Sequence, residues 1–158
     1  MKGELFALLA SFLWSFTALF FTKASRVLGT AKVNISRLFL GGFFLFLTLL
    51  ITGNGFNFSK GEFFYLSLSG IIGLGLGDWL LFESFLLLGP QLSMLIFTSS
   101  PLMTLLLSFI FLKEKISPLD FFGIILVISG ICLALIKNRL GKIVFKGVLF
   151  SFLGALMQ

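Results

Sequence analysis

The chain has little of the chemistry that most enzymes and metal sites use. Its 158 residues include no His and a single Cys, Cys132, which lies inside an apolar run. Disulfide frameworks, zinc clusters and Cys–His catalysis are therefore excluded within this chain. No paired acids, metal-ligand spacing or exposed nucleophile takes their place. We predict that the protein is not an enzyme and uses no cofactor or metal.

Charge is also scarce. Only 11% of the residues are charged, whereas soluble domains carry about 25%. Hydrophobic residues make up 58% of the chain, and its mean hydropathy is +1.15. This composition predicts a protein embedded in the lipid bilayer. The 12 Lys and Arg residues outnumber the 6 acids, but they stand in short breaks between apolar runs, which argues against a nucleic-acid partner.

Long apolar runs, by contrast, fill the chain. A helix that crosses a membrane needs about 20 mostly apolar residues. Such runs lie at residues 5–22, between 37 and 60, and at 62–88, 91–112 and 118–136, and a further run begins at Gly147. We therefore predict an all-α membrane protein, a five-helix transmembrane bundle with the start of a sixth helix. In the third run Gly70, Gly77 and Ser84 recur every seven residues, which indicates close helix packing.

The end of the chain repeats its beginning. Residues 146–158 align without gaps on residues 2–14, with identical Lys, Gly, Leu, Phe and second Leu positions. We predict a five-helix repeat at residues 3–137 and the beginning of a second, truncated repeat at 143–158. An odd number of spans inserts the second copy upside down. Inverted repeats recur in transporters because two opposed halves can rock around one midplane site.

Two carboxylates lie inside the third run, where charge is costly and usually faces a cavity or a partner. Asp78 stands near its middle. Glu83 is five residues further on, about 140° around a helix, so the two do not share a face. They are therefore not a carboxylate pair of the glycosidase or protease type. The alternatives are that Asp78 only bonds neighbouring hydroxyls, and that Glu83 reaches the interface or pairs with a Lys.

The fourth run adds polar groups at the same depth. Pro101 and Asp78 are equally far along the chain from the turn that joins their two runs, so they should lie level near the midplane. Pro101 removes a backbone donor and should kink its helix, next to the hydroxyl of Ser100. Trp14 lies in mid-span, away from the usual interfacial belt. The alternative is that Pro101 only shapes the bundle and Trp14 only packs. The predicted substrate site or pathway comprises Trp14, Asp78, Glu83, Ser100 and Pro101.

Motifs in a fixed order run through all five apolar runs. They are Trp14-Ser15, Lys23, Arg37-Leu38, Gly70 to Gly77, Leu80-Leu81-Phe82, Gly89-Pro90-Gln91-Leu92-Ser93, Ser100-Pro101-Leu102, Glu114-Lys115-Ile116-Ser117, Phe122-Gly123 and Ser129-Gly130-Ile131. In order and spacing they resemble the EamA family of the drug/metabolite transporter superfamily. The resemblance implies a ten-span carrier of two inverted five-helix repeats, which moves amino acids, metabolites or drugs through a central cavity.

These observations lead to one functional expectation and one alternative. We expect a multi-pass permease of the plasma membrane that carries small organic metabolites, amino acids or drugs by alternating access. Its partners would be the lipid bilayer, a small-molecule solute, and the missing second repeat or a second copy. The alternative is a non-transporting truncated fragment, or a half-size unit that acts only as a dimer or scaffold.

The orientation of the chain gives a first test. The resemblance implies a cytoplasmic N-terminus, which would put most Lys and Arg residues outside, whereas the positive-inside rule favours the reverse. We follow the charge rule and expect the N-terminus outside and the loop at Lys32 inside. In a Cys132→Ser background, a Lys32→Cys variant in intact cells should then resist a membrane-impermeant maleimide. Labelling from the outside would contradict this orientation.

Overall fold

The computed structural model describes residues 2–53, 59–113, 117–137 and 145–158, and the regular structure within these ranges is helical. The predicted all-α fold is therefore confirmed. The elements, in order, are α1 (Lys2–Leu28), α2 (Thr30–Thr52), α3 (Lys60–Gly70), the π-helix η1 (Ile71–Gly77), α4 (Asp78–Leu88), α5 (Pro90–Phe97), α6 (Ser100–Leu107), the π-helix η2 (Ser108–Leu112), α7 (Pro118–Lys137) and α8 (Phe145–Met157).

Several of these elements join into longer helices. Segments α3, η1 and α4 form one run, Lys60–Leu88, and α5, α6 and η2 form another, Pro90–Leu112. With α1 and α2, they give four helices that are long and apolar enough to cross a membrane. The apolar helices Pro118–Leu133, within α7, and Phe145–Met157 are shorter. They coincide with the predicted fifth run and the predicted start of a sixth.

Backbone geometry rather than hydropathy sets the helix ends. Gly29 separates α1 from α2 with φ 86°, and Gly89 separates α4 from α5 with φ 85°. Residues with a side chain rarely adopt a positive φ, whereas glycine does so readily and lets the chain turn sharply there. Helix α2 consequently begins at Thr30, well before the apolar run that starts near residue 37. Hydropathy therefore predicted where this helix is apolar and missed where it begins.

Side-chain caps mark the starts of α3 and α7. The Ser59 hydroxyl accepts from the backbone N–H of Glu62 at 3.3 Å, and the Glu62 carboxylate accepts from the backbone N–H of Ser59 at 2.8 Å. The backbone N–H of Ser117 donates to the Asp120 carboxylate at 2.8 Å, and the Ser117 hydroxyl accepts from the Asp120 N–H at 3.2 Å. These reciprocal bonds satisfy N–H groups that a helix start leaves free. Ser59 and Ser117 thus cap the starts of α3 and α7.

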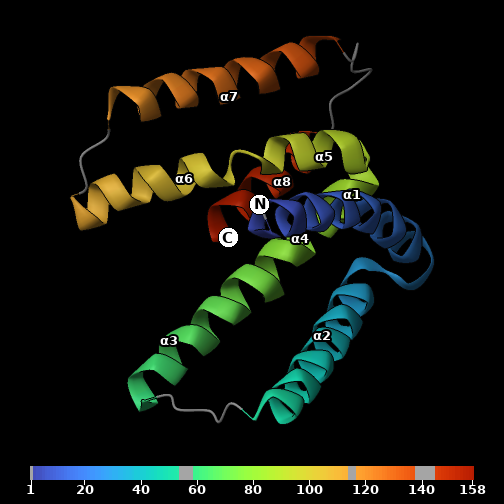
Figure 1. Ribbon diagram of the computed structural model, residues 1–158. Helices are drawn as coiled ribbons and strands as arrows, with labels where there is room; N and C mark the ends of the chain where they lie inside the picture. The colour runs from blue at the N-terminus through green and yellow to red at the C-terminus, as the bar shows by residue number, and fades with distance from the viewer. Residues whose placement is uncertain (1, 54–58, 114–116, 138–144) are drawn as a thin grey trace.

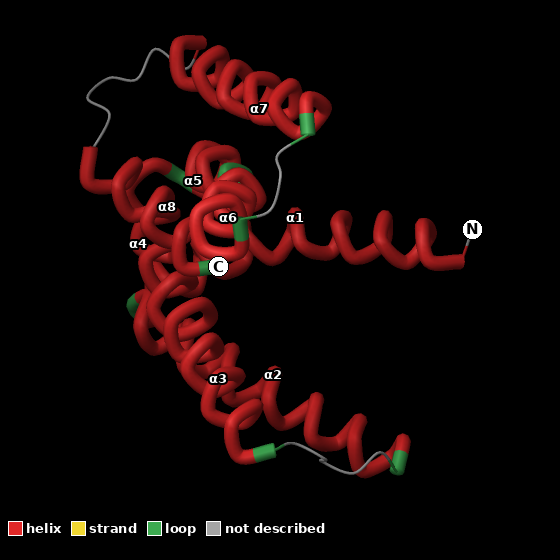
Figure 2. Tube along the Cα trace, turned by 90° about the vertical axis from the view of Figure 1, so that its left-hand side faces the viewer, coloured by secondary structure: helices red, strands yellow, loops and turns green. Residues whose placement is uncertain are grey.

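Helices α1, α4, α5 and α8 pack around one crossing point. From it α2 and α3 extend on one side and α6 extends on another, while α7 lies beyond α5 and α6 (Figure 1). The N-terminal half of α1 projects alone (Figure 2). Apolar side chains on these projecting segments are open, among them Leu5 at 68%, Phe39 at 76% and Ile51 at 84% exposure. Apolar surface on this scale suits contact with lipid or further helices.

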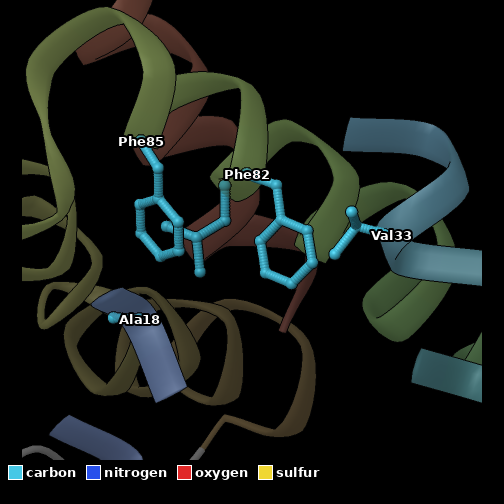
Figure 3. Close-up of a cluster of buried hydrophobic side chains, with 5 residues drawn as sticks. Ala18, Val33, Phe82 and Phe85 are labelled. Atoms are coloured by element: carbon cyan, nitrogen blue, oxygen red, sulfur yellow. The ribbon is translucent and has the colours of Figure 1, made fainter. Parts of the chain in front are cut away.

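The buried core is small and lies at the crossing. Phe82 and Phe85 point from α4 toward Val33 of α2 and Ala18 of α1 (Figure 3). The two Phe rings stack with their centroids 5.6 Å apart, and Leu81 completes the cluster. This core joins α4 to the consecutive helices α1 and α2, and it directly adjoins the polar groups described below.

Helix α8 is held against α4 by small residues. Gly77 and Ser84, two members of the predicted stripe, lie at this contact, while the third, Gly70, is open on its Cβ side. The Ser84 hydroxyl lies 2.7 Å from that of Ser151, which in turn donates to the Ser93 carbonyl at 3.1 Å. Lipid provides no hydrophobic force between helices, so close approach and hydrogen bonds hold such contacts.

This contact predicts a strong difference between two glycines. A Cβ at Gly154 would lie 2.9 Å from the Gly77 carbonyl oxygen, whereas a Cβ at Gly41 meets nothing within 4 Å. We expect Gly154→Ala to push α4 and α8 apart and to lower the free energy of unfolding by about 1–3 kcal/mol. The matched control Gly41→Ala should be neutral or stabilising, because Ala favours helix over Gly by about 1 kcal/mol. Thermal unfolding in detergent measures both, and equal midpoints would refute the close contact.

Candidate functional site

An ion pair joins α2 to α4 inside the helical crossing. The Arg37 guanidinium donates through Nη2 to Oδ2 of Asp78, the first residue of α4. The Asp78 side chain is 7% exposed and that of Arg37 is 25% exposed. A charge pair within apolar spans is expensive to desolvate and generally marks a cavity or a pathway. The predicted site residue Asp78 thus has a specific partner rather than the neighbouring hydroxyls considered as its alternative.

The π-helix η1 leads directly into this pair. A π-helix widens the backbone turn, and such segments are frequent at functional sites. Asn34 of α2 donates through Nδ2 to the carbonyls of Leu74 at 3.1 Å and Gly75 at 2.8 Å. Its Oδ1 accepts from Arg37 Nη2 at 3.0 Å. The Asn34 side chain therefore both anchors α2 to the widened turn and orients the Arg37 guanidinium.

Gln158, which directly follows α8, is another partner of the carboxylate. Gln158 Nε2 donates to Asp78 Oδ1 at 3.3 Å and to the Gly73 carbonyl at 3.2 Å. Both oxygens of the Asp78 carboxylate therefore have a donor. Gln158 thus links the Gly73 carbonyl of the π-helix to the Asp78 carboxylate.

The guanidinium of Arg37 lies against two aromatic rings. Its Cζ is 5.8 Å from the ring centroid of Phe21 and 5.4 Å from that of Phe82. Such contacts stabilise a cation through the negative faces of the rings. The Arg37 Nε is buried and makes no hydrogen bond within the described part of the chain. The cation is thus firmly held while part of its donor capacity stays unused.

A cavity of about 150 Å³ opens beside the ion pair. Arg37 and Asp78 form its polar edge. The rest of the wall is mainly apolar and includes Trp14, Phe21, Phe82, Phe85 and Met94. Trp14 is 57% exposed and also lines a neighbouring cavity of about 290 Å³ next to Pro90 and Gln91. The structure thus brings together two of the predicted site residues, Trp14 and Asp78.

Glu83 has a different environment. Its Oε1 accepts from the Thr30 hydroxyl at the start of α2, and Trp79 Nε1 donates to the same hydroxyl at 3.2 Å. Glu83 is therefore held by the Thr30 hydroxyl rather than by the Lys considered in the sequence. It does not line the cavity beside Asp78, as far as the described residues define that cavity. Glu83 and Asp78 both tie α4 to α2, at separate points.

Ser100 and Pro101 lie at a break in the fourth span. Helix α5 ends at Phe97, Thr98 and Ser99 form a turn, and α6 begins at Ser100. The predicted interruption next to Pro101 is thus present in the structure. Ser100 is half-buried and Pro101 is exposed, and the described lining of the Asp78 cavity includes neither. Another part of this region, Glu114-Lys115-Ile116, lies outside the described residues.

Sequence reasoning did not assign Arg37, Asn34 and Gln158 to this site. The sequence places Arg37 at the edge of the second apolar run, where a cation commonly stands. Asn34 stands three residues earlier, on the same helical face, so a polar pair at helical spacing was an available signal. Gln158 had no such signal, since its contact with Asp78 joins positions 80 residues apart. Within the described residues, no three His, Cys, Asp or Glu side chains gather as metal ligands would.

Comparison with known proteins agrees with the motifs. A family model described as the EamA-like transporter family matches residues 1–136. The match runs from the N-terminus through nearly all of α7, so the resemblance seen in the sequence is confirmed. Searches of curated proteins and of solved structures give no match.

The ion pair makes a testable contribution to stability. Removing one partner of a buried pair costs about 3–5 kcal/mol, and the partial exposure of Arg37 reduces this to about 2 kcal/mol for Asp78→Asn. The double variant Arg37→Met with Asp78→Leu leaves no uncompensated charge and should recover most of the loss. Thermal unfolding in detergent compares the three proteins. A double variant less stable than the single one would contradict this account of the pair.

Proposed function

Because the chain belongs to the EamA-like transporter family, whose members are membrane transporters and not enzymes, we propose that it carries small organic metabolites, amino acids or drugs across the plasma membrane by alternating access. The observation that carries this proposal is the cavity of about 150 Å³ with the Arg37–Asp78 pair at its edge. Residues from four apolar helices that are long enough to cross a bilayer line this cavity. A polar site between such helices is what a solute pathway requires.

The internal repeat supports two halves around one site. In the alignment of residues 2–14 on 146–158, Trp14 and Gln158 are equivalent positions. Trp14 lines the cavity beside Asp78, and Gln158 donates to Asp78 at 3.3 Å. Equivalent residues of two inverted repeats meet at one place when the symmetry axis passes through it. We therefore propose that residues 3–137 and 143–158 belong to two repeats that share this site.

Helices α1 and α8, which the internal alignment makes equivalent, differ in what covers their small residues. On α8, Gly147 and Gly154 are closely packed against α4. Their equivalents on α1, Gly3 and Ala10, are exposed. We propose that the second repeat covers this face of α1 with its counterpart of α4. The α4 of a second copy already holds its own α8, so it offers this surface less readily. The proposed contact between α1 and the second repeat's counterpart of α4 thus favours the two-repeat carrier over a dimer or scaffold.

Alternating access makes Trp14 a diagnostic position. In a Cys132→Ser background, a Trp14→Cys variant of the intact protein in sealed vesicles should react with impermeant maleimides added from either side. The cavity wall would face each side in turn, and a transported solute should slow the reaction. Lys60→Cys, at the exposed start of α3 and outside the described lining of the cavity, serves as control. It should react from one side only, at a rate that the solute does not change.

Uptake of a labelled solute panel by the same vesicles completes the test. We expect saturable uptake, reduced at least about tenfold by Asp78→Asn, which corresponds to about 1.4 kcal/mol in the barrier. Reaction of the Trp14→Cys variant from one side only, together with no uptake of any solute, would favour the scaffold alternative.

A further inference from the structure

The hydrogen-bond inventory of the site is unbalanced toward donors. Both carboxylate oxygens of Asp78 already accept, one from Arg37 and one from Gln158. Arg37 has five N–H groups, and its hydrogen bonds in the described residues all use Nη2. Its Nε is buried without a partner. A solute that supplies an acceptor would use N–H groups of Arg37 that have no partner in the described residues, whereas a solute that supplies only donors would compete with Arg37 and Gln158 for the Asp78 carboxylate.

The remainder of the cavity selects for an apolar body. Its wall is formed mainly by rings and aliphatic groups, including those of Trp14, Phe85 and Met94. A volume of about 150 Å³ equals that of an apolar cavity known to hold benzene. One ring or one branched chain therefore fits, with its acceptor toward Arg37. Because planar guanidinium matches carboxylate geometry, a carboxylate is the acceptor that Arg binds best.

The net charge of the site requires a proton when an anionic solute binds. Arg37 and Asp78 together are neutral, so an anionic solute would leave one uncompensated negative charge inside the spans. Such a charge is costly in a low-dielectric interior. Arg37 is the charged group that contacts Asp78 in the described residues, while Glu83 of the same helix faces Thr30. Other side chains that face the site are those of Trp14 on α1, Met94 on α5 and Gln158 after α8. These side chains carry no charge. A proton on Asp78 restores neutrality.

On the basis of the proposed carrier function, we propose that the solute is a small apolar monocarboxylate. Its carboxylate binds Arg37, its apolar body fills the cavity between Trp14 and Phe85, and Asp78 takes up one proton as the solute binds. In the solute-free protein Asp78 serves as the internal counter-ion of Arg37. Zwitterions and cations are disfavoured, because an ammonium group would compete with Arg37 for Asp78, the carboxylate in the described lining of the cavity.

Equilibrium binding to the purified intact protein in detergent tests this proposal without interference from passive membrane permeation. The probes are labelled benzoate, with phenylalanine and benzylamine as competitors that keep the ring and change the charge. We expect benzoate to bind and to be displaced by cyclohexanecarboxylate, but not by the two amines. Arg37→Gln should weaken benzoate binding at least about tenfold.

Proton linkage separates this role of Asp78 from a structural one. Because one proton accompanies each benzoate, affinity should fall by up to about tenfold per pH unit as pH rises. In weakly buffered solution, an indicator dye should report about one proton taken up per benzoate bound. Asp78→Asn should remove the pH dependence, because an amide cannot take up the proton. Glu62→Gln, at the exposed start of α3, is the matched control and should keep it.

Two outcomes would overturn the inference, and they differ from failure of the carrier function. Preferential binding of phenylalanine or benzylamine, or benzoate binding that is independent of pH and Arg37, would refute the monocarboxylate while leaving a carrier of other solutes. Should the indicator measurement show no proton uptake, the coupling fails even if Asp78→Asn does not fold. Absence of binding and of vesicle uptake for every probe would instead refute the carrier function itself.

Discussion

One charge pair between α2 and α4 organises this protein. A cation and an anion inside apolar helices are tolerated only when each has a partner, so the position of Arg37 fixes that of Asp78. Asn34 orients the cation, Gln158 holds the second carboxylate oxygen, and two Phe rings enclose the guanidinium. Helices that are distant in sequence are thereby brought to one point. The cavity beside this point follows from the same requirement, because the pair keeps polar groups where apolar side chains would otherwise close the space.

The packing around the pair divides the chain into two kinds of surface. Close to the pair, glycine and serine on α4 and α8 let backbones approach to contact distance. Away from it, α1, α2 and α3 present large apolar side chains outward. A membrane protein uses the first kind of surface to hold helices together and the second to meet lipid or further helices. Membership in the EamA-like transporter family is consistent with both.

The sequence was sufficient for the fold class because a bilayer imposes a minimum helix length, which apolar runs reveal directly. It also singled out Asp78, since a carboxylate in such a run is expensive. It did not reveal that Arg37 is its partner, because a cation at the edge of a run has an ordinary explanation. It could not show the π-helix η1 either. Its residues, Ile71–Gly77, are glycine and aliphatic, and hydropathy is the same for α and π turns.

The π-helix has a consequence for how this site tolerates change. A π segment accommodates a residue more per turn than an α-helix, and each residue of an α-helix turns the chain by about 100°. If Ile71–Gly77 kept its length but wound as an α-helix, everything after it would rotate by about 100°. Asp78 would then face away from Arg37, although no residue of the site had been altered. The π winding of this glycine-rich segment therefore sets the phase of α4 and aims its carboxylate.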